Sequence, residues 1–228
     1  MTETSQPSLS PFNRRFFDPE KRLTTIGRGS LGGKAQGLAF IHEVLAAQLD
    51  RAQFPNIPVT VPTLTVICTD FFDAFMKRND LHDIANSDEP DDRIAHAFQK
   101  ADLPVELLGD LRALVEQVRQ PLAVRSSSLL EDALHEPFAG IYETKMTPNN
   151  QPDPDARFRR LTEAIKLVYA STFFKAARDY RQATGHGTGD EKMAVIIQEV
   201  VGRHRHERFY PEVAGVARSY NFYPLRPA

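Results

Sequence analysis

The sequence predicts a mixed α and β fold. Stretches with apolar residues at three- and four-residue spacing alternate with short β-branched runs, and there is no internal repeat. The 228 residues, 41% hydrophobic and 25% charged, suffice for a core of ordinary composition. The net charge of −2 gives no basic field for nucleic acid, and no apolar run approaches the roughly 20 residues that span a bilayer. With Cys68 as its single cysteine the chain fits a reducing compartment, so we expect a cytoplasmic protein with no nucleic-acid or membrane partner.

The first third of the chain is expected to hold a tail, a helix, a strand and a short helix. Residues 1–13 are rich in Ser, Thr and Pro, as is typical of a flexible tail, which leaves 14–228 for the domain. The β-branched run within 59–67 predicts a strand, and Thr69 is placed to cap the short helix that follows. The first helix is expected to present one apolar face, made by Leu38, Ile41, Leu45 and Leu49.

The rest of the chain continues the alternation of helical and extended segments. The run at 192–201 is apolar throughout its middle, which is typical of a strand covered on both faces. We expect Gly185 to end a long helix. The expected elements are helices over 91–101, 104–119 and 158–184, strands over 121–125, 192–201 and 213–223, and a loop at 147–155.

A glycine-rich stretch, GRGSLGGKAQG at 27–37, contains G-x-G-x-x-G but fits no established glycine motif. The segment before it is charged and broken by Pro19, so the buried strand of a dinucleotide-binding fold is missing. A P-loop requires glycine at position 28 and Ser or Thr at 35, where the chain has Arg28 and Ala35. The protein-kinase loop requires valine at position 34, where the chain has Lys34. Two interpretations stay open. The glycines let backbone N–H groups and Lys34 approach an anion, or they only make a tight turn into the helix.

A second polar segment, AVRSSSLLEDALHEPFAGIYET at 123–144, follows a predicted strand. Arg125 offers a planar fork that suits phosphate oxygens, and the serines at 126–128 add hydroxyl donors. Gly140 would let a hairpin-like loop lie over a ligand. The alternative is a solvated pair between Arg125 and the acidic residues at 131–132, beside a serine-rich cap.

Several segments together carry a resemblance to a known family: GGKAQGLAFI, PTLTVICTDFFDAFM, AVRSSSLLEDALHEPFAGIYET, ASTFFKAARDYR, MAVIIQEVV and GVARSYNFYP. In this order they resemble the N-terminal nucleotide-binding domain of the phosphoenolpyruvate (PEP) synthase and pyruvate phosphate dikinase family. The same module occurs in glucan water dikinases and rifampin phosphotransferases. V-R-S-S with E-D and F-A-G downstream is the most specific part. The resemblance implies an α+β, ATP-grasp-like domain, in which two lobes clamp ATP between sheets.

The resemblance also assigns site residues one by one. Lys34 matches the family's phosphate-contacting lysine, and Arg125 matches the V-R-S-S arginine that touches the nucleotide phosphates. Gly140 and Thr144 match the loop that folds over the phosphates, and Gln198 matches a glutamine near the nucleotide. A lysine and an arginine that converge on a triphosphate would neutralise its charge. The expected catalytic residues are therefore Lys34 and Arg125, and all five are expected to bind ATP.

Two features depart from the family pattern. Ser-Leu-Leu at 128–130 stands where the family usually has Ala-Thr-Ala, so the chain is expected to be a divergent member. GRHRHERFYPE at 202–212 inserts a basic loop. We expect its His204 and His206 to be solvated rather than to bind a metal, since a metal site needs three or four ligands.

The resemblance implies a reaction that is spread over several domains. ATP is cleaved in this domain, a phosphohistidine on a swivelling domain carries the phosphoryl group, and a barrel binds PEP or pyruvate. In PEP synthase the sum is ATP, pyruvate and water to PEP, AMP and phosphate. The Mg²⁺-binding carboxylates, the carrier histidine and the barrel are expected outside this chain, so the domain should be incomplete at its C-terminal end and inactive alone. The alternatives are a non-catalytic regulatory or interaction module that retains the fold, and an unrelated α+β domain.

Overall fold

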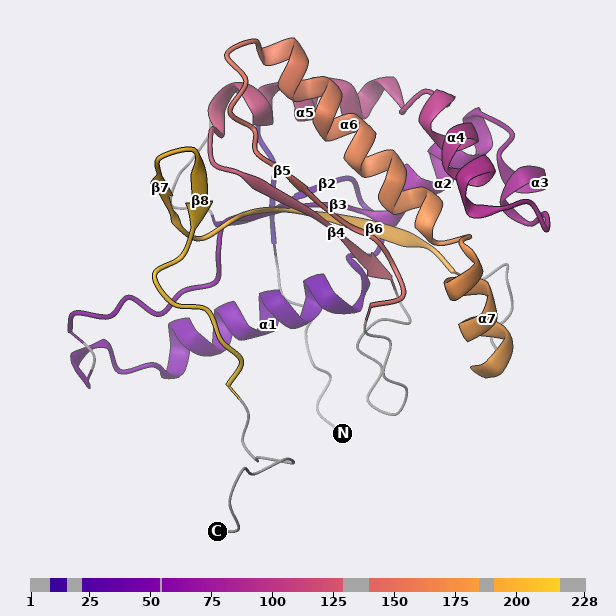
Figure 1. The fold of residues 1–228 in the computed structure, drawn as a ribbon. Coiled ribbons are helices and arrows are strands. Elements are labelled where there is room, and N and C mark those ends of the chain that lie inside the picture. Colours follow the sequence, from indigo (N-terminus) through magenta and orange to yellow (C-terminus); the bar gives the residue numbers. More distant parts are fainter. Residues whose placement is uncertain (1–8, 16–21, 54, 129–139, 185–190, 218–228) are drawn as a thin grey trace.

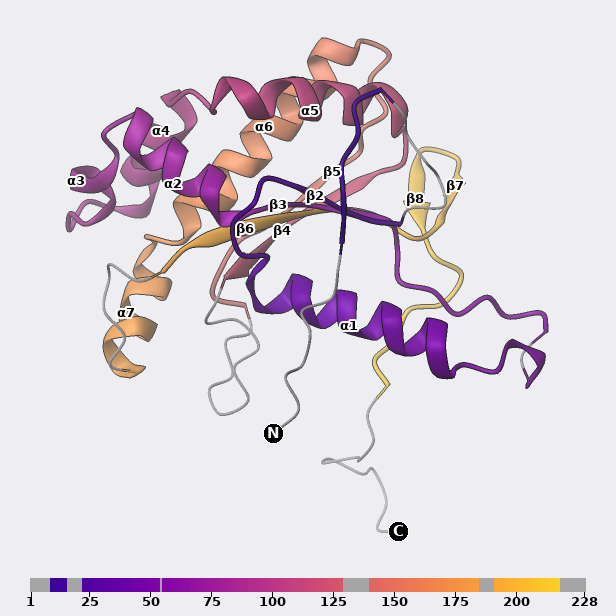
Figure 2. The same cartoon turned by 180° about the vertical axis from the view of Figure 1, so that it is seen from behind.

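A six-stranded mixed sheet with helices on both faces organises the computed structural model, which describes residues 9–15, 22–53, 55–128, 140–184 and 191–217. Helix α1 lies along one face of the sheet, and α2, α4, α5 and α6 lie on the other (Figure 1; the reverse view is Figure 2). The elements in chain order are β1 (Ser10–Pro11), β2 (Leu23–Ile26), α1 (Gly32–Gln48), a 3₁₀ turn (Arg51–Gln53), β3 (Leu64–Ile67), α2 (Thr69–Arg78), α3 (His82–Ala85), α4 (Asp91–Lys100), α5 (Val105–Gln117), β4 (Leu122–Ser128), β5 (Thr144–Thr147), α6 (Pro154–Ser171), α7 (Lys175–Thr184), β6 (Met193–Glu199), β7 (Arg203–Arg205) and β8 (Arg208–Tyr210).

The strand order of the sheet is β1-β2-β3-β6-β4-β5. Strands β1, β2 and β3 are parallel, whereas β6 is antiparallel to both of its neighbours and β5 is antiparallel to β4. β6, the last of these six strands in the sequence, therefore lies between β3 and β4. Its residues 193–197 are buried, as the apolar run predicted for a strand covered on both faces.

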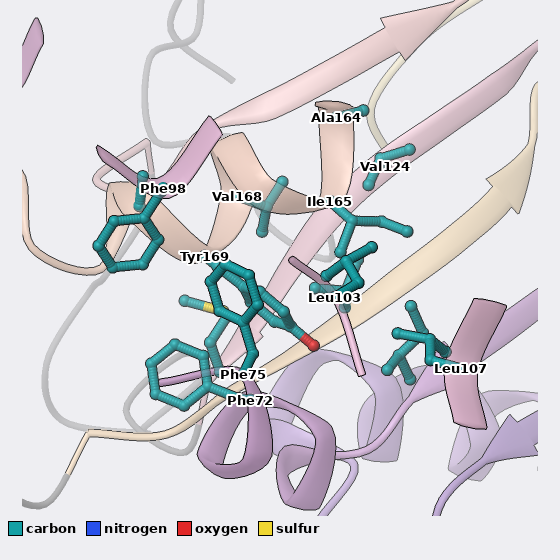
Figure 3. Close-up of a cluster of buried hydrophobic side chains, with 14 of the residues drawn as sticks. Phe72, Phe75, Phe98, Leu103, Leu107, Val124, Ala164, Ile165, Val168 and Tyr169 are labelled. Atoms are coloured by element: carbon teal, nitrogen blue, oxygen red, sulfur yellow. The ribbon is translucent and has the colours of Figure 1, made fainter. Parts of the chain in front are cut away.

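The larger of two hydrophobic cores lies between the sheet and helices α2, α4, α5 and α6. Packed aromatic rings form its centre, among them those of Phe72, Phe75, Phe98 and Tyr169 (Figure 3). Tyr169 packs against Phe72 and Phe75 with ring centroids 5.1 and 5.4 Å apart, and Phe75 is 5.8 Å from Phe98. Offset and edge-on contacts of this kind stabilise a core beyond the area they bury.

The smaller core lies between α1 and the other face of the sheet. Ala35 and Ala39 are buried there against Leu64 and neighbouring strand residues, because small side chains let the helix approach the sheet closely. The helix itself is confirmed, but the predicted buried face is wrong at Ile41, which is 48% exposed. Its apolar residues lie on nearly all sides, so spacing alone did not identify the contact face.

Most of the other predicted elements are confirmed, and the long helix is the main correction. It breaks after Ser171 and restarts at Lys175. Phe173 turns into the aromatic core in between, and Asp91 accepts a hydrogen bond from the Lys175 backbone N–H at 2.7 Å. These two contacts hold the break, and Thr184 is the last residue of the second helix.

Three smaller expectations also differ from the structure. The part of the predicted tail that is described joins the sheet, because Ser10–Pro11 pairs with β2 as β1. Thr69 is the first residue of α2 rather than its N-cap, which is Cys68. The described part of the predicted strand at 213–223 forms no strand, and Val213 there is 86% exposed. None of the described helices is both long and apolar enough to cross a bilayer.

Candidate functional site

The glycine-rich turn before α1 is packed against the start of α2. The Asp70 carboxylate accepts hydrogen bonds from the backbone N–H groups of Arg28 and Gly29, at 3.0 and 3.1 Å. Thr69 Oγ1 accepts from the Ser30 N–H at 2.9 Å. These three N–H groups are therefore satisfied inside the protein. At these positions the tight-turn interpretation fits and the anion-binding interpretation does not.

The start of α1 rests on the backbone of β4. Gly32 has a φ of +73°, and a Cβ at this position would lie 1.8 Å from the Ser127 carbonyl oxygen. Only glycine fits such a contact. Two residues later, Lys34 Nζ donates to the Ser126 carbonyl oxygen at 3.0 Å, with Ser126 Oγ at 3.4 Å. Lys34 is thus held beside the residue that follows Arg125.

Side chains alternate between the two faces of β4, as in any strand. Leu122 and Val124 belong to the larger core, whereas Ser127 bonds to α1 on the opposite face. Arg125 shares the α1 face with Ser127 because the two are separated by two positions. The strand therefore presents its charged residue on the side where Lys34 and α1 lie.

Arg125 reaches across to β6. Its Nη1 donates to Gln198 Oε1 at 2.9 Å. Within the described ranges no carboxylate forms an ion pair with Arg125. A guanidinium has five donors, and an uncharged amide oxygen neutralises none of its charge. A partly buried arginine of this kind is well suited to bind an anion.

Thr144 lies directly opposite Arg125 in the β4–β5 pair, so the two side chains share a face of the sheet. Thr144 is exposed. Gly140 lies four residues earlier with a φ of +79° and open space at its Cβ position. The structure thus brings Arg125, Thr144 and Gln198 together on the α1 face. Gly140 lies shortly before the start of β5. The acidic residues at 131–132, the alternative partners expected for Arg125, lie outside the described residues.

The serines after Arg125 do not serve as free hydroxyl donors, which corrects the sequence interpretation. Ser126, Ser127 and Ser128 are all at most 1% exposed. Ser127 Oγ is bonded to α1, and Ser126 Oγ lies near Lys34. They join β4 to its neighbours instead of facing a ligand.

Burial raises the pKa of several titratable groups near the candidate residues. Desolvation raises the pKa of the Cys68 thiol to about 11, with the Asp70 charge adding to the effect. Burial likewise raises the pKa of Tyr142, which precedes β5, and the Glu191 charge raises it further. Burial raises the pKa of Glu199, and Arg22 opposes that shift. A low dielectric of this kind strengthens the interaction between a bound anion and the cations nearby.

The predicted basic loop forms the β7–β8 hairpin. The His204 ring packs edge-on against Phe209 at 5.0 Å, and His206 has a φ of 56°. Within the described part of the chain, no three His, Cys, Asp or Glu side chains gather closely enough to hold a metal ion.

Among the described residues, two hollows lie beside β5. One of about 540 Å³ lies between β5 and α6 and includes Lys145 and Arg160 in its lining. The other, of about 370 Å³, lies between the end of β5 and the hairpin, with Met146, His204 and Phe209 in its lining. Lys34 and Arg125 line neither of these two hollows.

The family comparison covers nearly the whole chain. The sequence model described as the pyruvate phosphate dikinase AMP/ATP-binding domain matches residues 28–226. No curated protein matches the chain. The matched span contains Lys34, Arg125, Thr144 and Gln198, and the mixed α+β sheet with flanking helices agrees with such a domain. The chain belongs to the family of pyruvate phosphate dikinase AMP/ATP-binding domains.

Proposed function

We propose that this domain holds ATP against the α1 face of its sheet and presents it for phosphoryl transfer in a dikinase-type enzyme. Lys34 and Arg125 bind the phosphates, Gly140 and Thr144 lie over them, and Gln198 fixes Arg125 from the neighbouring strand. The observation that carries the proposal is the arrangement of Arg125, Thr144 and Gln198 on one face, next to the lysine at the start of α1.

The chemistry of these side chains suits a polyphosphate. Arg125 presents a planar donor fork, and no carboxylate among the described residues pairs with it. Lys34 of α1 adds a second positive charge, because its Nζ binds the carbonyl oxygen of Ser126, the residue after Arg125. Two cations at a partly buried surface stabilise charge that develops on phosphate oxygens during transfer. None of these four side chains is a carboxylate, the ligand type that Mg²⁺ prefers, so the role proposed for them is to bind the nucleotide.

The reaction we propose for the whole enzyme follows PEP synthase. ATP, pyruvate and water give PEP, AMP and phosphate through a phosphohistidine on a separate swivelling domain, with pyruvate held in a barrel. In this scheme Mg²⁺ accompanies the nucleotide and neutralises its phosphates. The 228 residues are expected to bind nucleotide without forming PEP on their own.

Calorimetric titration tests the proposal. ATP should bind to the wild-type chain in the presence of Mg²⁺, and Arg125→Ala should weaken it about tenfold to a hundredfold, the range for a hydrogen bond to a charged group. Adenosine affinity should not change in Arg125→Ala, because the arginine acts on the phosphates. Arg159→Ala, an exposed arginine on α6, is the matched control and should bind ATP as the wild type does. Absence of ATP binding, or equal binding by Arg125→Ala, would favour a non-catalytic interaction module.

A further inference from the structure

The hydroxyl of Ser127 bridges the first turn of α1, although it belongs to β4. Ser127 Oγ donates to the Leu31 carbonyl oxygen at 2.8 Å and accepts from the Ala35 backbone N–H at 3.0 Å. Leu31 is the N-cap residue of α1, and its apolar side chain makes no capping bond. These two backbone groups are four residues apart and form the i to i+4 pair of the first helical turn. Ser127 thus anchors the first turn of α1 to a neighbouring strand.

The same junction is tight on the backbone side. Gly32 approaches the Ser127 carbonyl so closely that any Cβ would clash, and Ser127 is fully buried. Its hydroxyl and its carbonyl group therefore both contact the first turn of α1. A buried hydroxyl that donates one bond and accepts another, both within the same helical turn, fixes the position of that turn on β4.

Lys34 belongs to the turn that this junction fixes. It precedes Ala35, whose N–H is bonded to Ser127, and its own Nζ binds the Ser126 carbonyl oxygen. Three consecutive residues of β4 therefore contribute to the proposed binding of the phosphates. Arg125 faces the proposed phosphates, Ser126 receives the lysine, and Ser127 fixes the helix that carries it.

We propose that Ser127 is a positioning residue, which sets the distance between Lys34 and Arg125 by anchoring the first turn of α1 to β4. It does not touch the nucleotide, since its hydroxyl is buried and used within the protein. This inference rests on the proposed function, in which Lys34 and Arg125 bind the phosphates of one nucleotide.

A double-mutant cycle with ATP titration tests it. Ser127→Ala and Lys34→Met should each weaken ATP binding about tenfold, and the double variant should be no weaker than Lys34→Met alone, because residues in one network are not additive. Adenosine affinity should stay unchanged in all three variants. In the ligand-free protein, amide exchange at Ala35 should rise in Ser127→Ala and return toward the wild-type rate in Ser127→Thr, which keeps the hydroxyl.

Ser171→Ala is the matched control. Ser171 is also fully buried, and its hydroxyl also donates to a carbonyl oxygen, that of Val168, and accepts from a backbone N–H, that of Glu143. Its substitution should lower the melting temperature comparably but show full additivity with Lys34→Met. If Ser127→Ala does not fold, Ser127→Cys, which keeps the size and weakens the bonds, replaces it in the cycle.

The outcomes separate the two proposals. If Lys34→Met weakens ATP binding but Ser127→Ala multiplies that loss, or has no effect, the positioning role is overturned and the proposed function stands. If neither Lys34→Met nor Arg125→Ala weakens ATP binding, the proposed function fails and the positioning role fails with it.

Discussion

Arg125 and Gln198 bind each other diagonally across two strands, at 2.9 Å, although Ala123 is the residue directly opposite Gln198. The arginine is thus directed along the sheet rather than away from it. Because Gln198 is uncharged, the contact orients the guanidinium and leaves its charge available.

Replacing that glutamine by glutamate tests whether the available charge matters. Gln198→Glu would place a carboxylate beside Arg125, which would compete with phosphate, so ATP affinity should fall about tenfold or more. Gln198→Met removes the hydrogen bond without adding charge and should cost less. Calorimetric titration measures both variants. Equal affinities for the two would show that the charge of Arg125 is not used for binding.

Two glycines of α1 should respond in opposite directions to alanine. Gly32→Ala should lower the free energy of unfolding by about 2 kcal/mol or more, because the position has a positive φ and its Cβ would strike the Ser127 carbonyl. Gly37→Ala should raise it by about 0.5–1 kcal/mol, since the site is exposed, open and in the middle of the helix. Urea denaturation measures both. A similar loss for the two would mean that Gly32 does not rest on β4 as described.

The glycine-rich turn should depend on Asp70 for its stability. Asp70→Ala leaves the N–H groups of Arg28 and Gly29 without their acceptor and should lower the free energy of unfolding by about 1–3 kcal/mol. Asp73→Ala on the same helix removes only an exposed pair with Lys192, so it should change stability by less than about 1 kcal/mol. Thermal denaturation of both variants makes the comparison. The interpretation fails if Asp70→Ala is as mild as its neighbour.

Cys68 should make the protein less stable at alkaline pH. Burial raises the pKa of its thiol to about 11 in the folded protein, above the ordinary value of 9.0. The proton is therefore held more tightly in the folded state. The corresponding stability is fully present below pH 9 and is lost as the pH rises toward 11. Cys68→Ala should flatten the dependence of urea midpoints on pH in that window, whereas an unchanged slope would assign it to other groups.

The same burial should make the thiol unreactive at neutral pH. Native protein should react with a thiol reagent far more slowly than protein in urea, because the thiolate is the nucleophile and the side chain is 2% exposed. Comparable rates in the two conditions would contradict the position of Cys68 at the start of α2.

How much of this could be read from the sequence depends on how local each feature is. The strand at β6 and the helices α4 and α5 follow from runs of apolar residues and were predicted closely. The break between α6 and α7 was missed because it depends on Phe173 entering a core built by α2 and α4, and on Asp91 of α4. Periodicity along a single segment contains no signal for such contacts.

The residues of the candidate site are even farther apart in the sequence. Arg125 and Gln198 are 73 positions apart, and their meeting depends on a strand order that no single segment specifies. Only the resemblance to a family grouped them. The roles of Asp70 and Ser127 were missed for the same reason, since each binds a glycine turn or helix start that is remote in sequence.

Because side chains alternate along β4, the larger core and the candidate site both depend on the register of this one strand. Even-numbered residues such as Val124 belong to the larger core, and odd-numbered residues such as Arg125 lie on the α1 face. An insertion or deletion of one residue within this strand would exchange the two sets, placing the arginine in the larger core and valine on the α1 face. This strand should therefore tolerate some substitutions, but a change of its length by one residue should abolish folding and binding together.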